Sequence, residues 1–346
     1  MASDSTTLCT FDDTRLTEIS GLTHSLSHED VLWMHNDSGD GPRLYALNAA
    51  TCDVIATVRI TGVKAIDFEA IGSGVDERGR SVLWVADIGD NTSERKGVTL
   101  HRIVEPSDLR DQKVTADSYS VRYDSPADAE AIIVGDDALW IVTKGLASGS
   151  VLRFPLPLVD KARAESVGTE EGLVTDAAIA PDGEHYVVRD YTEARIYAGP
   201  PPGTLIARLP LPEQVQGEAI TWAPDGTGLD IASESDNRII RVALPAEISV
   251  TPKPSDAPTE NGMSVSPAPS STEVPPESPA PETPPASQPN ADDSDEAAPT
   301  SASSVLDPAE QLGSLSLLAI AISGGVFLIA TIAVVAVIWV KDRRTA

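Results

Sequence analysis

The first 247 residues repeat one pattern of polar and apolar positions five times. Each unit opens with an acidic residue followed by small or apolar residues, and then passes through a turn rich in Asp, Gly or Ser. A second apolar run, a polar loop, a third alternating run and a variable fourth run complete most units. Short alternating runs separated by turn residues are typical of antiparallel β-strands. The acids that open the five units are Glu18, Glu69, Glu130, Asp176 and Glu218.

Four short strands in each repeat predict a β-propeller, in which every unit forms one blade. The acids recur at intervals of 42 to 61 residues, and five units fit residues 6–247. The last unit has no clear fourth strand, so we expect residues 6–11 to supply it and to close the ring without an open sheet edge. The alternatives are a six-bladed ring with a weakly marked unit in residues 106–123, and a two-sheet sandwich. The sandwich does not explain the recurring order of acid, turn and Leu-Trp.

The composition changes after the repeats. Residues 248–311 are rich in Pro, Ser and Glu, hold 14 of the 27 prolines and show no periodicity, so we expect a disordered stalk. Residues 315–340 are uncharged and apolar, and about 20 such residues are enough for a helix to cross a bilayer. A buried core helix is the alternative. The chain is therefore expected to have a head, a stalk, one transmembrane helix from Leu315 to Val340, and a tail at 341–346.

The charges around residues 315–340 predict an orientation. Three basic residues between 341 and 344 follow this segment, whereas acids precede it, so the positive-inside rule places the tail in the cytoplasm and the head outside the plasma membrane. A head outside needs an export signal, and residues 1–11 have neither the basic nor the apolar part of one. We expect a signal upstream or one that has been removed. A tail-anchored protein with a cytoplasmic head is the alternative.

Propeller geometry predicts where the repeated acids lie. The first strand of each blade lines the central channel and neighbouring strands run antiparallel, so the start of the first strand and the end of the second meet at one mouth. The five acids are expected to ring this mouth, with Asp67 and Asp128 nearby. Residues at the ends of the second strands are expected there too: Asp37, Asp87, Asp90, Asn91, Lys144, Arg189, Asp190 and Glu234.

Two interpretations of this acidic mouth stay open. In the first, the acids accept hydrogen bonds from backbone amides of the next blade, which their repetition in every unit favours. In the second, they bind Ca²⁺, which takes six to eight oxygen ligands. Lys144 and Arg189 do not suit a pure metal site, and either bind an anionic ligand or pair with acids. The candidate ligands for Ca²⁺ are Asp37, Glu69, Asp87, Asp90, Asn91, Glu130, Asp190 and Glu218.

Other functional classes find little support. The formal net charge is −28 and the basic residues are scattered, which argues against nucleic acid as a partner. The five histidines show no metal-ligand spacing, and metalloprotease, nucleophile-elbow, P-loop and dinucleotide motifs are absent from the sequence. The two cysteines, Cys9 and Cys52, fit either one disulfide in an exported domain or two buried free thiols.

Several stretches of the head resemble a group of exported, often C-terminally anchored actinobacterial propeller proteins of unknown function. The likeness covers about residues 8–240 and implies an exported head with a Cys9–Cys52 disulfide. The residues that carry it are Cys9, Leu16–Leu22, Asn36, Asp37, Cys52, Asp67–Glu69, Leu83–Asn91, Arg95, Asp128–Ala131, Thr143 and Lys144.

The repeat of an acid and small residues also looks, more remotely, like that of phytase-like, SdiA-regulated and gluconolactonase-like propellers. Those families often hold Ca²⁺ at the channel mouth, and some hydrolyse phosphoesters or lactones. The present sequence lacks their dense basic phosphate pocket, so the resemblance does not carry catalysis over.

The leading hypothesis is a membrane-anchored, extracytoplasmic binding or sensory head that uses its acidic mouth for a cation or a small ligand, with an unknown small ligand or an envelope protein as its partner. The first alternative is a Ca²⁺-dependent hydrolase of a phosphoester or lactone, with Glu69, Glu130, Lys144 and Arg189 as catalytic candidates. The second is a structural envelope protein. The sequence favours binding over catalysis and does not name the ligand.

Overall fold

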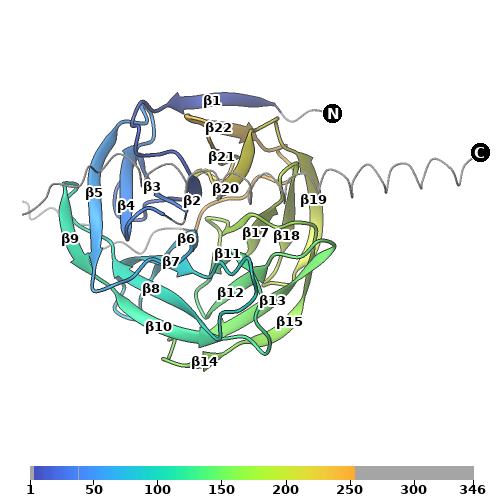
Figure 1. Ribbon diagram of the computed structural model, residues 1–346. Helices are drawn as coiled ribbons and strands as arrows, with labels where there is room; N and C mark the ends of the chain where they lie inside the picture. The colour runs from blue at the N-terminus through green and yellow to red at the C-terminus, as the bar shows by residue number, and fades with distance from the viewer. Residues whose placement is uncertain (1–3, 38, 254–346) are drawn as a thin grey trace, which may run out of the picture. The chain divides into compact units, whose positions relative to one another are not determined.

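The computed structural model describes residues 4–37 and 39–253, which form a five-bladed β-propeller (Figure 1). The predicted five-bladed ring is confirmed, and the six-bladed ring and the sandwich are wrong. The predicted transmembrane segment 315–340, the tail and the stalk beyond Lys253 lie outside the described residues. Within the described part, no helix is long and apolar enough to span a bilayer.

Each blade is a meander of four antiparallel strands. Blade 1 contains β2 (Ile19–His24), β3 (Val31–Asn36), β4 (Arg43–Asn48) and β5 (Val54–Thr61). Blade 2 contains β6 (Phe68–Val75), β7 (Ser81–Asp87), β8 (Val98–Val104) and β10 (Asp117–Arg122). Blade 3 contains β11 (Ala129–Val134), β12 (Ala138–Thr143), β13 (Ser148–Pro155) and β15 (Glu165–Glu171). Blade 4 contains β16 (Asp176–Ile179), β17 (His185–Arg189), β18 (Glu193–Ala198) and β19 (Thr204–Pro210). Blade 5 contains β20 (Gln216–Trp222), β21 (Gly228–Glu234), β22 (Arg238–Ala243) and β1 (Ser5–Thr10).

Two short strands extend the outer edges of blades 1 and 2. β9 (Gln112–Thr115) runs parallel to β5, and β14 (Ala162–Arg163) runs parallel to β10. Residues 106–123, which the six-bladed alternative needs for an extra blade, instead supply β9 to blade 1 and β10 to blade 2. This segment is too short to form four strands of its own.

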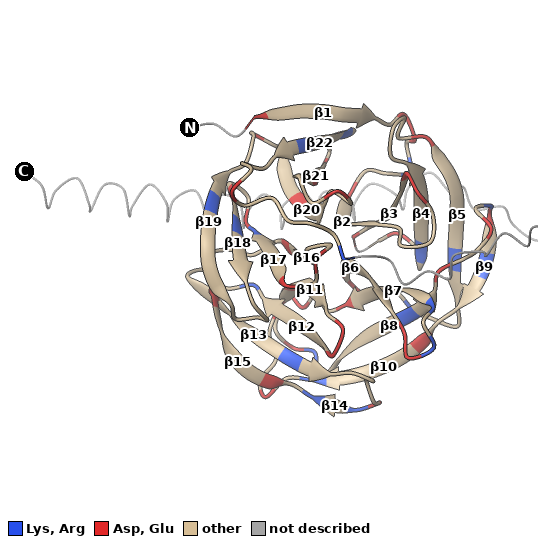
Figure 2. Ribbon diagram, turned by 180° about the vertical axis from the view of Figure 1, so that it is seen from behind, with Lys and Arg blue, Asp and Glu red and all other residues tan. Residues whose placement is uncertain are grey.

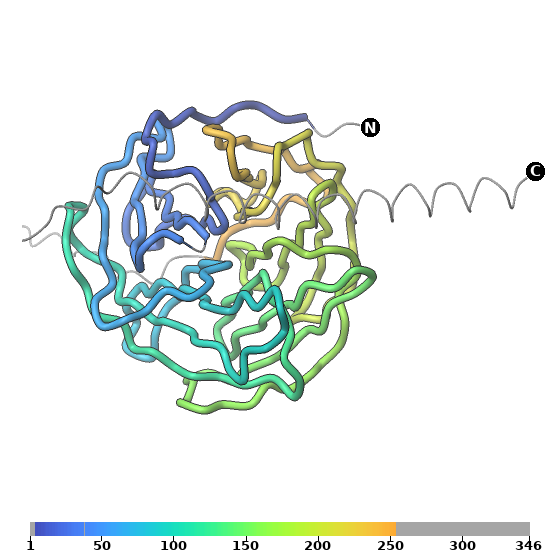
Figure 3. The backbone as a smooth tube through the Cα atoms, viewed as in Figure 1, coloured from blue at the N-terminus to red at the C-terminus, as the bar shows by residue number. Residues whose placement is uncertain are grey.

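The two ends of the ring close on each other as expected. β1 pairs antiparallel with β22, so the N-terminal strand lies beside the last strand of the repeat (Figure 3). Cys9 on β1 forms a disulfide with Cys52, which lies between β4 and β5 of blade 1. The disulfide that the resemblance implies is confirmed, and it joins blade 5 to blade 1 across the closure.

The core is divided into five apolar clusters, one between each pair of neighbouring blades. Three blades repeat Leu-Trp on their second strand. The indole of Trp33 packs between blades 1 and 2, that of Trp84 between blades 2 and 3, and that of Trp140 between blades 3 and 4. Burial of a large aromatic side chain at each of these junctions stabilises the ring.

Four of the five inner strands contain a β-bulge near the same mouth of the channel. The register shifts leave one extra residue in each strand: Ser20 in β2, Glu69 in β6, Glu130 in β11 and Glu218 in β20. A bulge bends the strand and redirects the side chain of the extra residue. Ser20 rather than Glu18 is therefore the structural counterpart of Glu69, which corrects the repeat alignment in blade 1.

The five inner strands all run in the same direction along the channel, because each one starts a blade. Their first residues lie at one mouth, which we call the acidic mouth, and their last residues lie at the other, which we call the far mouth. β6 runs from Glu69 to Val75 between the two, a path of roughly 20 Å at about 3.3 Å per residue.

Candidate functional site

Five carboxylates converge at the acidic mouth, with Glu69 at their centre. Oxygen atoms of Asp37, Asp67 and Glu69 lie within 4.8 Å of one another, and so do oxygen atoms of Glu69, Asp128 and Glu130. We call these five residues the carboxylate cluster. They come from blades 1, 2 and 3, and Figure 2 shows acidic segments around the centre of the ring as well as on peripheral turns. The cluster offers only oxygen ligands.

Burial and mutual repulsion make the ionised form of the cluster costly. Burial, followed by the charge of Glu130 and the other acids, raises the pKa of Glu69 far above its ordinary value. Burial and the charge of Asp37 raise the pKa of Asp67 to about 6. Burial raises the pKa of Glu130 to about 8, although Lys144 opposes the change. Carboxyl groups in this situation hold protons unless a cation offsets their charge.

One basic side chain reaches the cluster from blade 3. Lys144 follows β12, and its Nζ donates a hydrogen bond to Oε1 of Glu130 at 2.9 Å. The same Nζ lies 5.8 Å from the centre of the Tyr191 ring. Burial acts to lower the pKa of Lys144, but Glu130 and Tyr191 raise it above the ordinary value, so the ammonium stays charged. Glu130 is therefore partly neutralised, whereas Glu69 is not.

The loop after β7 holds the first half of the cluster in place. Asp87 ends β7 and accepts hydrogen bonds from the backbone N–H groups of Ile66 and Asp67, at 3.0 and 3.2 Å. Arg95 closes the loop, donating to Asp87 at 2.8 Å and to the Gly89 carbonyl at 2.7 Å. Asp87 therefore positions the backbone of Asp67, and its negative charge is balanced by the ion pair with Arg95.

Asp90 holds the second half of the cluster. Its backbone N–H donates to Oδ1 of Asp128 at 2.7 Å, while its carboxylate accepts the N–H groups of Glu94 and Arg95 at 2.9 and 2.8 Å. Asp87 and Asp90, which the sequence offers as ligands, thus support the cluster from beneath. Asn91, the third candidate of this loop, is exposed.

Gly89 lets this loop approach the carboxylates. A Cβ at this position would lie 2.3 Å from Oε1 of Glu69 and 2.4 Å from Oδ2 of Asp67, closer than real Cβ atoms come to other atoms. The backbone of the loop therefore forms the floor of the cluster, and only glycine fits there without moving two of its members.

The remaining candidates lie in blades 4 and 5. Asp190 accepts the N–H groups of Thr192 and Glu193, both at 2.8 Å, and pairs with Arg195 at 2.7 Å. Arg189 is fully buried and donates to the Ala219 carbonyl at 3.0 Å, and burial lowers its pKa to about 10. Both side chains are occupied by contacts within their own blades or with the next one.

Two further acids of the ring differ in their surroundings. Asp176 is fully buried and accepts the N–H groups of Ile220 and Ala177, both at 2.8 Å, so it ties blade 4 to blade 5. Glu218 accepts a hydrogen bond from Gln216 at 2.9 Å through one oxygen, and its other oxygen is buried without a hydrogen-bond partner among the described residues. The backbone-bonded interpretation therefore describes Asp176, while Glu218 extends the acidic channel beyond the carboxylate cluster.

Asp67 and Asp128 were outside the ligand set proposed from the sequence, although both were expected nearby. Each precedes a glutamate of the repeat by two residues, in Asp67-Phe-Glu69 and Asp128-Ala-Glu130. This shared Asp-x-Glu spacing was the available signal, because it places two carboxylates together at the start of one inner strand. It occurs in blades 2 and 3, the two blades that supply four of the five carboxylates.

No family model matches this sequence, and no curated protein matches it either. The solved structures that resemble its fold include the following two. A gluconolactonase from Xanthomonas campestris shares 12% identity over 66% of this chain and 72% of its own, with a TM-score of 0.42. A PQQ-bound aldose sugar dehydrogenase from Streptomyces coelicolor shares 9% identity over 70% of this chain and 98% of its own, with a TM-score of 0.44. These likenesses concern the fold alone and assign the chain no activity.

Proposed function

We propose that the head is a Ca²⁺-binding module that is displayed at the cell surface as a binding or sensory domain. The observation that carries this proposal is the convergence of five carboxylates on Glu69. Asp37, Asp67, Glu69 and Asp128 are the ligands, and Glu130 is shared between the cation and Lys144. Two groups of three carboxylates, which share Glu69 and come from three blades, supply several of the six to eight oxygen ligands that Ca²⁺ takes.

The residues present fit such a cation. All five side chains offer hard oxygen donors, which suit Ca²⁺ better than the nitrogen or sulfur donors that softer metals prefer. The glycine floor at Gly89 and the hydrogen bonds from the loop between Asp87 and Arg95 hold two of the ligands before binding. A divalent cation would relieve the repulsion that raises the pKa values of Asp67 and Glu69.

The display of the head at the membrane is the second part of the proposal. The Cys9–Cys52 disulfide supports an extracytoplasmic head, because structural disulfides persist in oxidising compartments. The apolar sequence 315–340 and the basic residues after it support a plasma-membrane anchor with a cytoplasmic tail. Protease treatment of intact cells tests this topology, and a head that stays protected contradicts it.

A hydrolase of a phosphoester or lactone is the second candidate, and the Glu130–Lys144 pair favours it. Glu130 has a pKa of about 8, so its carboxyl can exchange a proton near neutral pH. Lys144, at 2.9 Å, can stabilise negative charge that develops beside it. Screens with model phosphoesters and lactones distinguish this candidate from a pure binding module.

Calcium binding is tested by thermal melts of the purified chain in EDTA and in excess Ca²⁺. We expect Ca²⁺ to raise the melting temperature by roughly 5–10 °C, because saturation contributes about 2.7 kcal/mol and a domain of this size gains roughly 2–4 °C per kcal/mol. Glu69→Gln should abolish this shift while raising the melting temperature in EDTA, because Gln is uncharged already, whereas Glu69 must take up a proton when the chain folds. Glu165→Gln, on the exposed edge of blade 3, is the matched control. An equal shift in Glu69→Gln would contradict the ligand assignment.

A further inference from the structure

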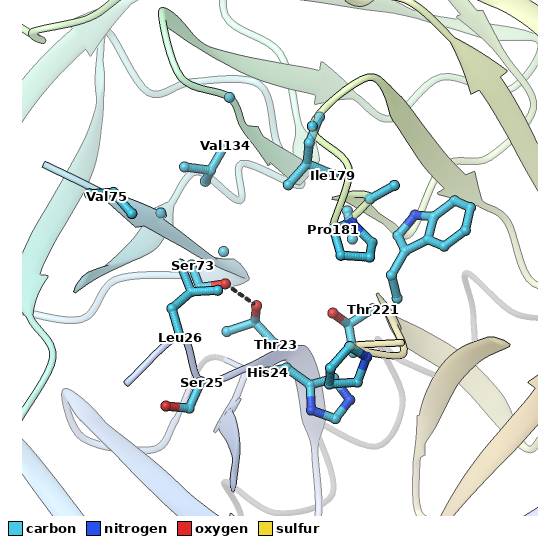
Figure 4. A pocket seen from close by; sticks show the side chains of 18 of the residues that line it. Thr23, His24, Ser25, Leu26, Ser73, Val75, Val134, Ile179, Pro181 and Thr221 are labelled. Atoms are coloured by element: carbon cyan, nitrogen blue, oxygen red, sulfur yellow. Dashed lines mark hydrogen bonds between the residues drawn. The ribbon is translucent and has the colours of Figure 1, made fainter. Parts of the chain in front are cut away.

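A cavity lies at the far mouth of the channel, about 20 Å from the carboxylate cluster by the length of the inner strands. Its volume is about 320 Å³, which is within the range of small-molecule sites. Figure 4 shows its lining side chains projecting into one open space from the last residues of the inner strands. The residues that define it are Thr23, Ser73, Val134, Ile179, Thr221 and Trp222.

The walls of this cavity are mainly apolar. On β6, two glycines without side chains form part of one wall. A Cβ at Gly72 would lie 2.6 Å from Val134, and a Cβ at Gly74 would lie 2.7 Å from the same side chain. The two glycines therefore let Val134 pack directly on the β6 backbone. A larger residue at either position would force the Val134 side chain to move. At the rim, Leu26 and Val75 are 55% and 60% exposed, which leaves apolar surface at the entrance.

The charged groups around the cavity are paired with one another. Nε2 of His24 and Oδ2 of Asp230 are 2.8 Å apart, and Asp230 also accepts a hydrogen bond from Arg241. Nζ of Lys253 donates to Asp136 at 2.9 Å. The cavity thus offers no unbalanced charge to an ionic ligand, and charged ligands would lose hydration without compensation.

A few hydroxyl groups provide the polar contacts of the cavity. Oγ1 of Thr23 on β2 donates to Oγ of Ser73 on β6 at 3.2 Å, and Figure 4 shows this hydrogen bond on one side of the cavity. Thr221 contributes a third hydroxyl from β20. Hydroxyls can donate or accept, so they suit a ligand with one or two uncharged polar groups.

The segment that follows blade 5 forms one side of this cavity through Pro252 and Lys253. Residues 244–253 run inward from the rim of the ring (Figure 3). The N–H of Val250 donates to the Gly226 carbonyl at 3.0 Å, and that of Lys253 to the Pro181 carbonyl at 3.0 Å. The next residues, 254–262, include two acids and no large apolar side chain, so their composition does not match the cavity.

We propose that the far mouth is a binding site for a small, uncharged, mainly apolar molecule that carries one or two hydrogen-bonding groups. The apolar walls bury its hydrocarbon part, and the hydroxyls of Thr23, Ser73 and Thr221 orient its polar group. This site is separate from the cation site and needs no Ca²⁺. One propeller therefore offers two ligand sites of opposite chemistry on one axis.

The test uses photolabelling of the full chain with an uncharged phenyl diazirine that bears a trifluoromethyl group, followed by peptide mass spectrometry. We expect labelling at Val134 or Trp222 in EDTA, and we expect excess phenol to compete for it. Ser73→Phe should lower this labelling by about tenfold, because the ring occupies the volume of the ligand. Ser107→Phe, which adds the same ring at an exposed position, should leave it unchanged.

Should Ser73→Phe fail to fold, Ile179→Trp fills the same cavity from β16 and is expected to have the same effect. Labelling of the cavity residues no stronger than that of Leu146, which is 93% exposed, would overturn the proposal. Strong labelling that neither variant reduces would overturn it as well. Because the experiment is carried out in EDTA, its result does not depend on whether the carboxylate cluster binds Ca²⁺.

Discussion

The two mouths of the channel are formed by the same five inner strands, yet one gathers carboxylates and the other gathers apolar side chains. At the acidic mouth, bulges turn Glu69 and Glu130 towards each other, and the loop from Asp87 to Arg95 supports their neighbours. At the far mouth, Gly72 and Gly74 let Val134 pack against β6 at the wall of an open cavity. The charged groups around this cavity are paired with one another. The difference shows that a repeated strand pattern can specify a ring while the chemistry at each end depends on a few residues.

The largest expected effect would act on both mouths alike. Replacing the disulfide in Cys9→Ser/Cys52→Ser removes a link across the ring closure that spans 43 residues. We expect a loss of about 4 kcal/mol in the free energy of unfolding, because the unfolded chain gains conformational freedom. Denaturant melts measure this loss.

The same double variant also tests whether the mouths are formed independently of the closure. Below its new melting temperature, the Ca²⁺ shift and the photolabelling should both persist, because neither Cys9 nor Cys52 belongs to the carboxylate cluster or lines the cavity. Loss of one and not the other would show that the closure shapes one mouth specifically.

A smaller effect should fall on the acidic mouth alone. Gly89→Ala places a methyl group against Asp67 and Glu69, so we expect Ca²⁺ affinity to fall by roughly 10–100-fold, as is usual when groups that orient metal ligands are altered. Isothermal titration calorimetry measures the affinity. Gly97→Ala in the same blade is the control, since its Cβ would lie 3.1 Å from the Val121 carbonyl oxygen and away from the cluster. Unchanged affinity in Gly89→Ala would remove the loop from the site.

A further expected effect is a pH dependence of the acidic mouth. In the folded head, the pKa of Glu130 is about 8 and burial raises that of Glu234 to about 7, both above the ordinary glutamate value. The folded state therefore binds more protons than the unfolded state in this range, and stability rises as the pH falls. Between about pH 8.5 and pH 7 in EDTA, we expect about 1 kcal/mol from these two groups. Glu69 binds a proton on folding throughout this range and adds about 2 kcal/mol, so the melting temperature should rise by roughly 6–12 °C.

The buried histidines set the lower limit of the pH range in this experiment. Burial lowers the pKa of His35 and of His101, so both oppose the trend only when the unfolded chain begins to protonate them, below about pH 7. Saturating Ca²⁺ should flatten the dependence, because the cation replaces the protons. A melting temperature that falls from pH 8.5 to pH 7 would contradict the electrostatic account of the cluster.

Most of the fold could be predicted from the sequence, because strand alternation and turn residues are local signals. The five units, the closure by residues near Thr6 and the division of the head from the stalk at about residue 247 rested on such signals, and the first two are confirmed. The alignment of Glu18 with Glu69 was wrong, because a bulge places Ser20 at that position. Bulges depend on pairing with the next strand, which a single repeat does not reveal.

The site was predicted in outline only. The sequence placed acids at one mouth, and Asp37, Glu69 and Glu130 do meet there. It did not separate ligand candidates from their supports, because Asp87 and Asp90 resemble ligands until their hydrogen bonds to the loop and to Arg95 are known. Asp67 and Asp128 were not among the ligand candidates, yet both belong to the cluster, because tertiary contacts bring their carboxylates close to Glu69.

The sequence by itself determined the number of blades and the acidic character of one mouth, because periodicity and composition act over many residues. The tertiary structure alone decided which carboxylates converge, that Asp176 ties two blades together, and that the far mouth is open. Those outcomes depend on packing between blades distant in sequence, where Gly89 admits a loop beneath two acids and Gly72 and Gly74 let Val134 form a wall.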